Sequence, residues 1–328
     1  MNDATKEQIS NDRISIGRNP VPQFPATANQ DEKIEILSVA LLDQNRELIQ
    51  SLKRLARSLH LEFGWHYLLD LTWIIKNLGS VSNKQIMDAG AGVGIIQWYL
   101  AQQGANVISV DRLDRADLAM GFRSRFQVQG LRKTDLMPRY SLLLKNFTNK
   151  RSGPFYRRWV KKYITFTRDL LQIIQKPQGA GRITIYNQDL ADLVDIPSDS
   201  LDAVVSVSAL EHNTKQGLGQ VVTEIMRVIK PGGMLLATLT ATYDEDWWHE
   251  PSKGWCLTES SIRQIFDPHP EVSSNYGEYS ELFEDLYNCA ELRDNLASFY
   301  YQSDQNGMPW GKWDPKYQPV GVCKIKKA

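Results

Sequence analysis

Residues 86–100 read IMDAGAGVGIIQWYL, and this stretch decides the fold. Two apolar residues lead to an acid, Asp88, and to three alternating glycines, Gly90, Gly92 and Gly94. Apolar residues then recur at helical spacing. This order predicts a buried strand, a tight turn and the start of a helix. Because glycine lacks Cβ, such a turn adopts positive φ angles and lets a ligand approach the backbone closely.

Four further β-branched runs follow the same plan. They cover Ala105–Asp111, Arg182–Asn187, Leu201–Ser208 and Met234–Leu239, and a helix over 216–229 separates the last two. Short strands that alternate with helices predict an α/β fold, with a doubly wound, mostly parallel sheet covered by helices on both faces. Ligands of such sheets bind at the carboxyl ends of the strands.

The remaining segments predict extensions on this core. Residues 1–30 are rich in Asn, Gln and Pro and are expected to be a disordered tail. N-terminal helices are expected over 31–80, and the first of them, 31–60, carries leucines at three- and four-residue steps. That stripe either packs on the domain or forms a coiled-coil dimer seam. A catalytic core domain would then fill 81–328, with a basic helical insertion at 114–181 and a substrate-cap region at 241–315.

Charge is balanced over the chain but not along it. With 38 Lys and Arg and 38 Asp and Glu, the formal net charge is zero, which disfavours a dedicated nucleic-acid binder. Residues 139–176, however, contain ten basic residues and one acid. Within them, 154–176 predicts a basic amphipathic helix. Its aromatic face packs on the domain, or the helix docks on an anionic membrane, or Arg157 and Arg158 grip a phosphate-bearing substrate.

Other sequence features exclude some sites and compartments. The three cysteines have no metal-like spacing, so no metal site is expected. The first residues lack an apolar signal region and no run is long enough to span a bilayer. We therefore expect a cytoplasmic protein, at most peripheral to the inner face of a membrane.

The glycine spacing limits the ligand. A dinucleotide fingerprint needs G-x-G-x-x-G, and neither Gly90 nor Gly92 starts one. No Walker lysine follows the glycines. Asp111 ends the next strand, 17 residues after Gly94, where an acid can accept hydrogen bonds from both ribose hydroxyls. A nucleoside without phosphate is the simplest ligand that fits, and a nicotinamide oxidoreductase is the weaker alternative.

Five segments of the sequence, in their order along the chain, resemble a known family. Residues 86–94, Asp111, 188–190, 201–213 and 224–233 are similar to the ordered motifs of class I, Rossmann-like S-adenosylmethionine-dependent methyltransferases. The resemblance implies a seven-stranded sheet whose last strand is antiparallel, and S-adenosyl-L-methionine as the cofactor. It also implies the following cofactor contacts: Asp88, Gly90, Gly92 and Gly94 around the methionine part, Asp111 at the ribose, Asp189 and Leu190 at the adenine, and Ser206 and Ser208 near the amino group.

Candidate catalytic and acceptor-binding residues follow the fourth strand and the fifth. A base of near-neutral pKa suits methyl transfer, so His212 is the first candidate, with Glu211 beside it. Both residues could instead cap the following helix. His249 is the second candidate. Tyr243, Trp247 and Trp248 predict a binding wall for the acceptor, or alternatively a hydrophobic cluster under a loop.

These patterns predict a methyltransferase that acts on a small or medium-sized acceptor, more often at oxygen than at nitrogen or carbon. A sugar, glycolipid or phosphate-bearing biosynthetic intermediate is the preferred acceptor, and nucleic acid is not expected. The competing hypothesis is a non-catalytic cofactor-binding scaffold that oligomerises through residues 31–60. A homodimer is left open.

Overall fold

A computed structural model describes residues 31–148, 155–174 and 181–327; the side chains of 155–158, 161 and 304 also lie outside the description. The expected tail at 1–30 falls outside the described residues. The strands are β1 (Lys33–Ile36), β2 (Gln85–Ala89), β3 (Asn106–Asp111), β4 (Gln127–Gly130), β5 (Arg182–Asn187), β6 (Leu201–Val207), β7 (Ile229–Ala241), β8 (Trp247–His249), β9 (Gly254–Leu257), β10 (Ser273–Ser274) and β11 (Gln318–Ile325). The α-helices are α1 (Ala40–Gln44), α2 (Arg46–Leu59), α3 (Tyr67–Leu78), α4 (Ile95–Gln102), α5 (Met120–Arg125), α6 (Arg139–Thr148), α7 (Phe155–Ile174), α8 (Lys215–Val228), α9 (Glu259–Phe266), α10 (Tyr279–Tyr287) and α11 (Ala290–Asp294).

The strands form one sheet in the order β10-β1-β11-β7-β6-β2-β3-β5-β4, and the β8–β9 hairpin joins it through β7. Strands β4, β5, β3, β2, β6 and β7 run parallel, and β11 is antiparallel to β7. The predicted doubly wound fold and antiparallel last strand are confirmed. The strand number of seven is too small, because the described residues contribute eleven strands, several of them very short.

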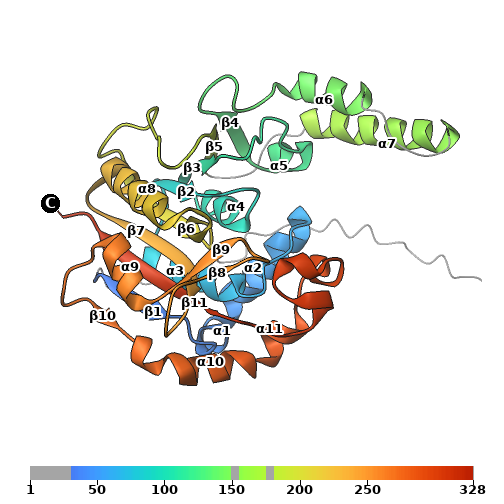
Figure 1. The fold of residues 1–328 in the computed structure, drawn as a ribbon. Coiled ribbons are helices and arrows are strands. Elements are labelled where there is room, and N and C mark those ends of the chain that lie inside the picture. Colours follow the sequence, from blue (N-terminus) through green and yellow to red (C-terminus); the bar gives the residue numbers. More distant parts are fainter. Residues whose placement is uncertain (1–30, 149–154, 175–180, 328) are drawn as a thin grey trace, which may run out of the picture.

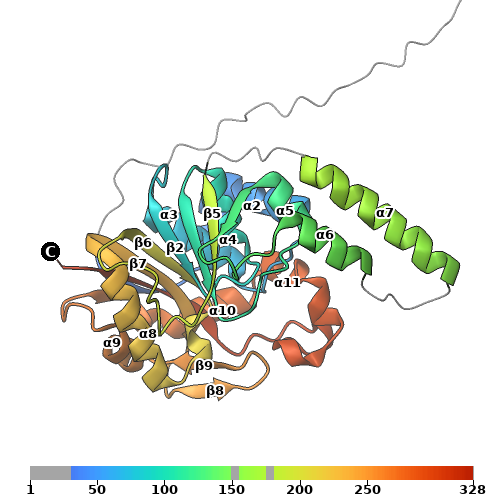
Figure 2. The ribbon, with the colours of Figure 1, turned by 90° about the horizontal axis from the view of Figure 1, so that it is seen from above.

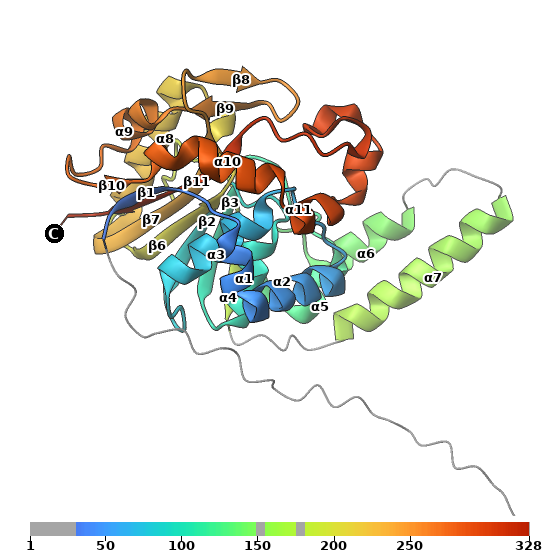
Figure 3. The ribbon, with the colours of Figure 1, turned by 90° about the horizontal axis from the view of Figure 1, so that it is seen from below.

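The chain leaves β2 in one direction toward β3 and β5, and returns on the other side through β6 and β7. The sheet therefore has a topological switch point between β2 and β6, where ligands of such folds bind. Two apolar layers cover its faces. One contains α2, α3 and α4, and the other contains α8 and α9 (Figures 2 and 3).

The single helix predicted over 31–60 is wrong in its first part. Residues 33–36 form β1, whose Ile34 and Ile36 are buried while Lys33 and Glu35 are half-exposed. This alternation has the two-residue period of a strand, and β1 pairs with both β11 and β10. The helical part, α2, buries Leu48 and Leu52 in the core of the same chain. Packing on the domain, rather than a dimer seam, is therefore the role of the leucine stripe.

Glycine ends the last of the helices expected over 31–80. This helix, α3, begins at Tyr67, and its C-cap is Gly79 with φ 65°. Of the aromatic residues that precede or begin it, Trp65 and His66 are buried in the core layer.

The insertion between β3 and β5 is mixed rather than purely helical. It contains α5, the edge strand β4, and the helices α6 and α7. Figure 1 shows α6 and α7 side by side at one end of the molecule, and the same pair projects beyond the sheet in Figures 2 and 3. The region 241–315 contains the β8–β9 hairpin, α9, β10, α10 and α11. None of the helices within the described ranges combines the length and the hydropathy that a bilayer crossing requires.

Candidate active site

The glycine turn follows β2 at the centre of the sheet. Gly90 has φ 76°, and a Cβ built on it would lie 2.4 Å from the Cβ of Ala209. The amides of Gly90 and Ala91 both donate to the carbonyl of Val110 at 3.0 Å, which fixes the turn to the end of β3. Gly94 then precedes the first residue of α4. Only glycine fits the first position, because both the φ angle and the contact with Ala209 exclude a side chain.

Buried polar side chains brace this turn from behind. Gln97 donates to the carbonyls of Ala91 at 3.3 Å and Gly94 at 3.1 Å, and accepts from the hydroxyl of Ser109 at 2.7 Å. Its side chain is fully buried. A buried amide with several partners of this kind holds the loop backbone in one conformation.

Arg115 is the second brace. Its guanidinium donates to the carbonyl of Gly92 at 3.0 Å, to Ser109 and to the carbonyl of Tyr186 at 3.2 Å. It therefore joins the glycine turn to the ends of β3 and β5. Burial lowers the pKa of this guanidinium, against the raising influence of Asp111 and other acids.

Asp111 closes the turn from the end of β3. One carboxylate oxygen accepts from the amide of Gly92 at 2.7 Å, and the other accepts from the amide of Leu113 at 2.7 Å. A carboxylate has about four acceptor positions, so Asp111 keeps capacity for two more donors. Its neighbour Arg112 is exposed and also lines the cavity described below.

Asp88 lies beneath the turn, on β2. It is 2% exposed, and its Oδ2 has no hydrogen-bond partner. Burial raises the pKa of the Asp88 carboxyl to about 7; Arg115 opposes this rise and Asp111 adds to it. A buried acid with an unpartnered oxygen behind a polar cavity is suited to a cationic ligand, which would favour its ionised form.

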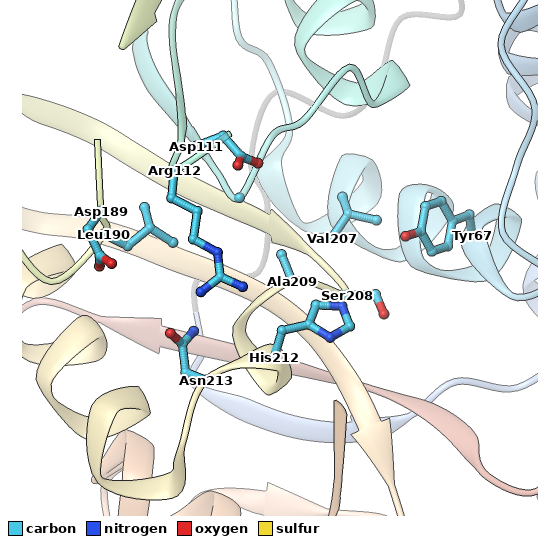
Figure 4. A pocket seen from close by; sticks show the side chains of 11 residues that line it. Tyr67, Asp111, Arg112, Asp189, Leu190, Val207, Ser208, Ala209, His212 and Asn213 are labelled. Atoms are coloured by element: carbon cyan, nitrogen blue, oxygen red, sulfur yellow. The ribbon is translucent and has the colours of Figure 1, made fainter. Parts of the chain in front are cut away.

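A cavity of about 290 Å³ opens at the carboxyl ends of β2, β3, β5 and β6 (Figure 4). Its lining comes from five separate segments: Tyr67; Gly90; Asp111 and Arg112; Asp189 and Leu190; and Val207, Ser208, Ala209, His212 and Asn213. This is the position at which the switch-point rule places a ligand.

The segment after β6 contributes a buried acid next to the cavity. Ser208 has φ 44°, and its hydroxyl donates to Glu211 at 2.5 Å. Glu211 is 1% exposed and its second oxygen has no partner. Burial raises the pKa of Glu211, while His212, Ser208 and His66 act in the opposite direction. The strained backbone at Ser208 and the buried acid together mark this segment as functional.

His212 is exposed at the cavity wall, and in Figure 4 its ring points toward Ser208 and Ala209. Its Nδ1 lies 2.8 Å from the carbonyl oxygen of Lys253. Because a carbonyl can only accept, Nδ1 carries the proton in the neutral ring. The lone pair is then on Nε2, and the ring is oriented to accept a proton there.

The predicted cofactor-contact residues differ in whether they line this cavity. The hydroxyl of Ser206 donates to the carbonyl of Ala89 at 2.9 Å inside the sheet. Asp189 does line the cavity, and one of its oxygens also accepts from the amide of Ala191 at 2.9 Å. Gly92 and Gly94 belong to the turn without lining the cavity.

The predicted second base and the tryptophan wall belong to another cluster. His249 is buried, and its Nδ1 is hydrogen-bonded to the hydroxyl of Ser252 at 2.7 Å. Its ring contacts the rings of Trp247 and Tyr317. Burial lowers the pKa of His249. Trp248 packs against Trp255, and Tyr243 is 56% exposed. The cavity lining includes none of these residues: Trp247 packs against the apolar core, whereas Trp248 and Tyr243 are exposed.

The side chains of Arg157 and Arg158 lie outside the described residues. Sequence reasoning missed the two braces, Gln97 and Arg115, as well as Arg112 and Asn213 in the lining. Asn213 stands beside the recognised Glu211 and His212, so proximity could have indicated it. A charged residue that is buried four positions after a strand gives no such signal.

Comparisons with known proteins agree with this geometry. A family model described as "Methyltransferase domain" matches residues 163–237, which include Asp189, Ser208 and His212. Ubiquinone biosynthesis O-methyltransferases from strains of Acinetobacter baumannii are 38% identical over 53 residues, or 16% of this chain and 22% of theirs. The chain therefore matches about a fifth of the length of these curated relatives.

Solved structures resemble the chain at low similarity. Phosphoethanolamine N-methyltransferase 2 of Haemonchus contortus has 14% identity and a TM-score of 0.45 over 88% of this chain and 59% of its own. The 1,6-didemethyltoxoflavin-N1-methyltransferase of Burkholderia thailandensis has 12% identity and a TM-score of 0.41 over 88% and 89%. The [4+2]-cyclase SpnF has 13% identity and a TM-score of 0.39 over 76% and 77%.

Likenesses at this level carry no inference about what this chain binds. A family model for a methyltransferase domain does match residues 163–237, which run from within α7 to β7. The glycine turn after β2 and the acid at the end of β3 lie outside that match, and their arrangement resembles that of class I, Rossmann-like S-adenosylmethionine-dependent methyltransferases.

Proposed function

We propose that the protein transfers a methyl group from S-adenosyl-L-methionine to an acceptor hydroxyl. The observation that supports this proposal is the cavity. It is lined by Gly90 of the glycine turn and by Asp111 and Asp189, which follow the neighbouring strands β3 and β5. The bound cofactor supplies a methyl group already activated on a positively charged sulfur. The chain itself then has to bind, orient and deprotonate the acceptor.

The residues present fit this cofactor. Gly90 leaves the backbone of the turn bare, and Asp111 has acceptor capacity left for the two ribose hydroxyls. Asp189 and the Leu190 backbone lie across the cavity, where they would contact the adenine. The unpartnered oxygen of Asp88 adds negative charge behind the turn, which suits the cationic methionine part.

His212 would act as the general base. Its Nδ1 donates to the carbonyl of Lys253, so Nε2 can take the acceptor's hydroxyl proton as the new carbon–oxygen bond forms. Ser208 and Glu211 stand behind it and complete that wall of the cavity. This pairing of a cofactor cavity with a free imidazole nitrogen supports oxygen rather than carbon as the methylated atom.

The acceptor class is proposed as a sugar, a glycolipid or a phosphate-bearing biosynthetic intermediate. Arg112 brings a cation to the cavity lining, which suits an anionic group on the acceptor. The partly matched curated relatives are O-methyltransferases by name, and this supports the same choice. The tryptophan cluster around His249 gives the acceptor no support, since it does not line the cavity.

Other partners stay proposals too. The burial of Leu48 and Leu52 removes the grounds for a scaffold that dimerises through residues 31–60. Peripheral membrane contact through residues 154–176 depends on helix α7, described below, and the cavity does not bear on it.

Titration calorimetry tests the cofactor assignment. The protein should bind S-adenosylhomocysteine and not NAD, and Asp111→Ala should abolish the binding. Asp117→Ala is a matched control, because Asp117 is an exposed acid of the same loop paired with Lys145. Tight NAD binding with no response to S-adenosylhomocysteine would overturn the proposal.

A further inference from the structure

Helix α7 is attached to the protein by one face only. Phe166 and Ile173 pack against Leu142 and Leu143 of α6 and against Met120 of α5. All three views show the α6–α7 pair projecting beyond the sheet, and Figures 2 and 3 show α7 on the outer side of the pair. The opposite face of α7 is therefore the surface that the protein offers to its surroundings.

That outward face is apolar. Tyr163 is 71% exposed, Ile164 61%, Leu171 65% and Ile174 73%. Trp159, Val160 and Leu170 are exposed as well. At about 100° per residue, these seven positions fall within roughly 140° of the helix circumference, a sector that also contains the exposed Thr167. Apolar surface of this extent on one element marks an interaction site.

The inward face contains the helix's buried polar residues. Asp169 is 2% exposed and accepts hydrogen bonds from Asn146 at 3.0 Å and from Arg168 at 3.2 Å. The ammonium of Lys162 lies 5.8 Å from the ring of Phe147. An ordinary surface helix turns its apolar stripe to the core and its polar face to water. In α7 the predicted aromatic face is divided: Phe166 and Ile173 pack on α5 and α6, whereas Trp159, Tyr163 and Leu170 are exposed. Packing on the domain therefore describes only part of that face.

The charges of α7 identify the kind of partner. Its sequence, FYRRWVKKYITFTRDLLQII, contains five cations and one acid, and that acid is the buried, hydrogen-bonded Asp169. The helix therefore combines a broad apolar stripe, with two aromatic residues in it, and a positive charge. Helices of this composition lie in the interface of anionic bilayers, where aromatic rings occupy the headgroup level and cations meet lipid phosphates.

We propose that the outward face of α7 docks the protein on an anionic lipid bilayer. A second copy of the chain fits the helix less well, because pairing two α7 helices would bring two clusters of cations together without an exposed acid on either. The face is also convex and projects from the body, which suits insertion between headgroups better than the flat self-complementary patch of a dimer.

If the protein docks in this way, the acceptor would be a lipid-borne molecule, and this statement about the acceptor rests on the proposed methyl transfer. The proposal that α7 docks on a bilayer does not depend on the methyl transfer. The insertion that carries α7 follows β3, and β3 ends at the cavity residue Asp111.

Vesicle co-sedimentation tests the proposal on the full chain. The protein should sediment with vesicles of phosphatidylcholine mixed with phosphatidylglycerol, and should stay in solution with phosphatidylcholine alone. Ile164→Glu and Leu171→Glu should each weaken binding at least about tenfold, because each removes a large apolar contact and adds repulsion. Ile164→Gln separates these effects and should weaken binding without adding charge.

Tyr287→Glu is the matched control, since it places the same acid at an exposed aromatic position on α10. It should bind vesicles as the unchanged protein does. S-adenosylhomocysteine affinity, measured on each variant, should not change, so a failure of docking is distinguished from a failure of the cofactor site. Absence of vesicle binding, equal binding by the α7 variants, or a dimer that the same variants dissociate would each overturn the proposal.

Discussion

At the scale of single residues, the proposed chemistry depends most on His212. Replacing it by alanine removes the Nε2 lone pair but touches neither the glycine turn nor Asp111. We expect His212→Ala to lower kcat by about 10²–10⁴-fold, the usual contribution of a general base, with little change in S-adenosylhomocysteine affinity. Rate measurement with an identified acceptor checks this. His269→Ala, at an exposed histidine, is the control, and full activity of His212→Ala would rule out the base.

Asp88 makes cofactor binding depend on pH. Burial raises its pKa to about 7, so the carboxyl is mostly protonated at pH 6 and mostly ionised at pH 8. A cationic ligand binds the ionised form, and its apparent affinity should therefore rise by up to about tenfold over this range. Calorimetry with S-adenosyl-L-methionine, whose sulfonium carries the positive charge that S-adenosylhomocysteine lacks, measures the slope at several pH values. In Asp88→Asn the slope should vanish; a slope that persists would place the titrating group elsewhere.

At the scale of elements, the glycine turn and the segment after β6 fit together through one contact. Gly90→Ala should weaken cofactor binding and destabilise the fold, because its Cβ would lie 2.4 Å from that of Ala209 and its φ is 76°. The double change Gly90→Ala with Ala209→Gly removes the clash but keeps the φ penalty of about 1 kcal/mol. We expect thermal melting to show partial recovery in the double variant. Equal stability of the single and double variants would show that φ strain, not contact, dominates.

The elements also show where sequence reasoning succeeds. Strands β2, β3, β5 and β6 and the glycine turn were predictable, because each buried run is bounded by glycine or an acid. Strand β1 was not, because Ile34 also fits the three- and four-residue steps of the helical leucines that follow it. In a stretch of four residues the two periods cannot be separated.

Within the site, the residues on strand ends were predictable and their supports were not. Asp111 is indicated by its distance from the glycines. Gln97 and Arg115 become interpretable only when their burial and backbone partners are known. The orientation of α7 was likewise inaccessible, since a helical pattern gives the width of an apolar stripe but not what the stripe faces.

At the scale of the whole molecule, stability should fall as pH rises from about 5 to 8. Burial raises the pKa of Asp70, Asp88 and Glu211 above their unfolded values. The folded state then holds more protons than the unfolded chain in this range, so deprotonation favours unfolding. His249 acts in the opposite sense, because burial lowers its pKa and the neutral form prevails in the folded state.

Because the folded-state pKa of Asp88 is about 7, its carboxyl loses stabilisation throughout this range, and the raised pKa values of Asp70 and Glu211 act in the same direction. The acids whose pKa values are lowered, such as Glu224 and Asp246, titrate below this range and do not contribute. Chemical denaturation at pH 5, 6, 7 and 8 measures the trend. The fall should be smaller in Asp88→Asn than in the unchanged protein, and a stability that rises steadily with pH would contradict the prediction.

The pairing of β1 with β11 also sets the order in which the protein can be made. Lys33 pairs with Cys323 and Ile36 with Val320, so one of the first described strands meets the last one. Strand β11 lies between β1 and β7 in the sheet. Until β11 leaves the ribosome during synthesis, β1 and β7 therefore each expose an unpaired strand edge. The nucleoside cavity lies on strands completed earlier, but the sheet that supports it closes only when synthesis has passed residue 325.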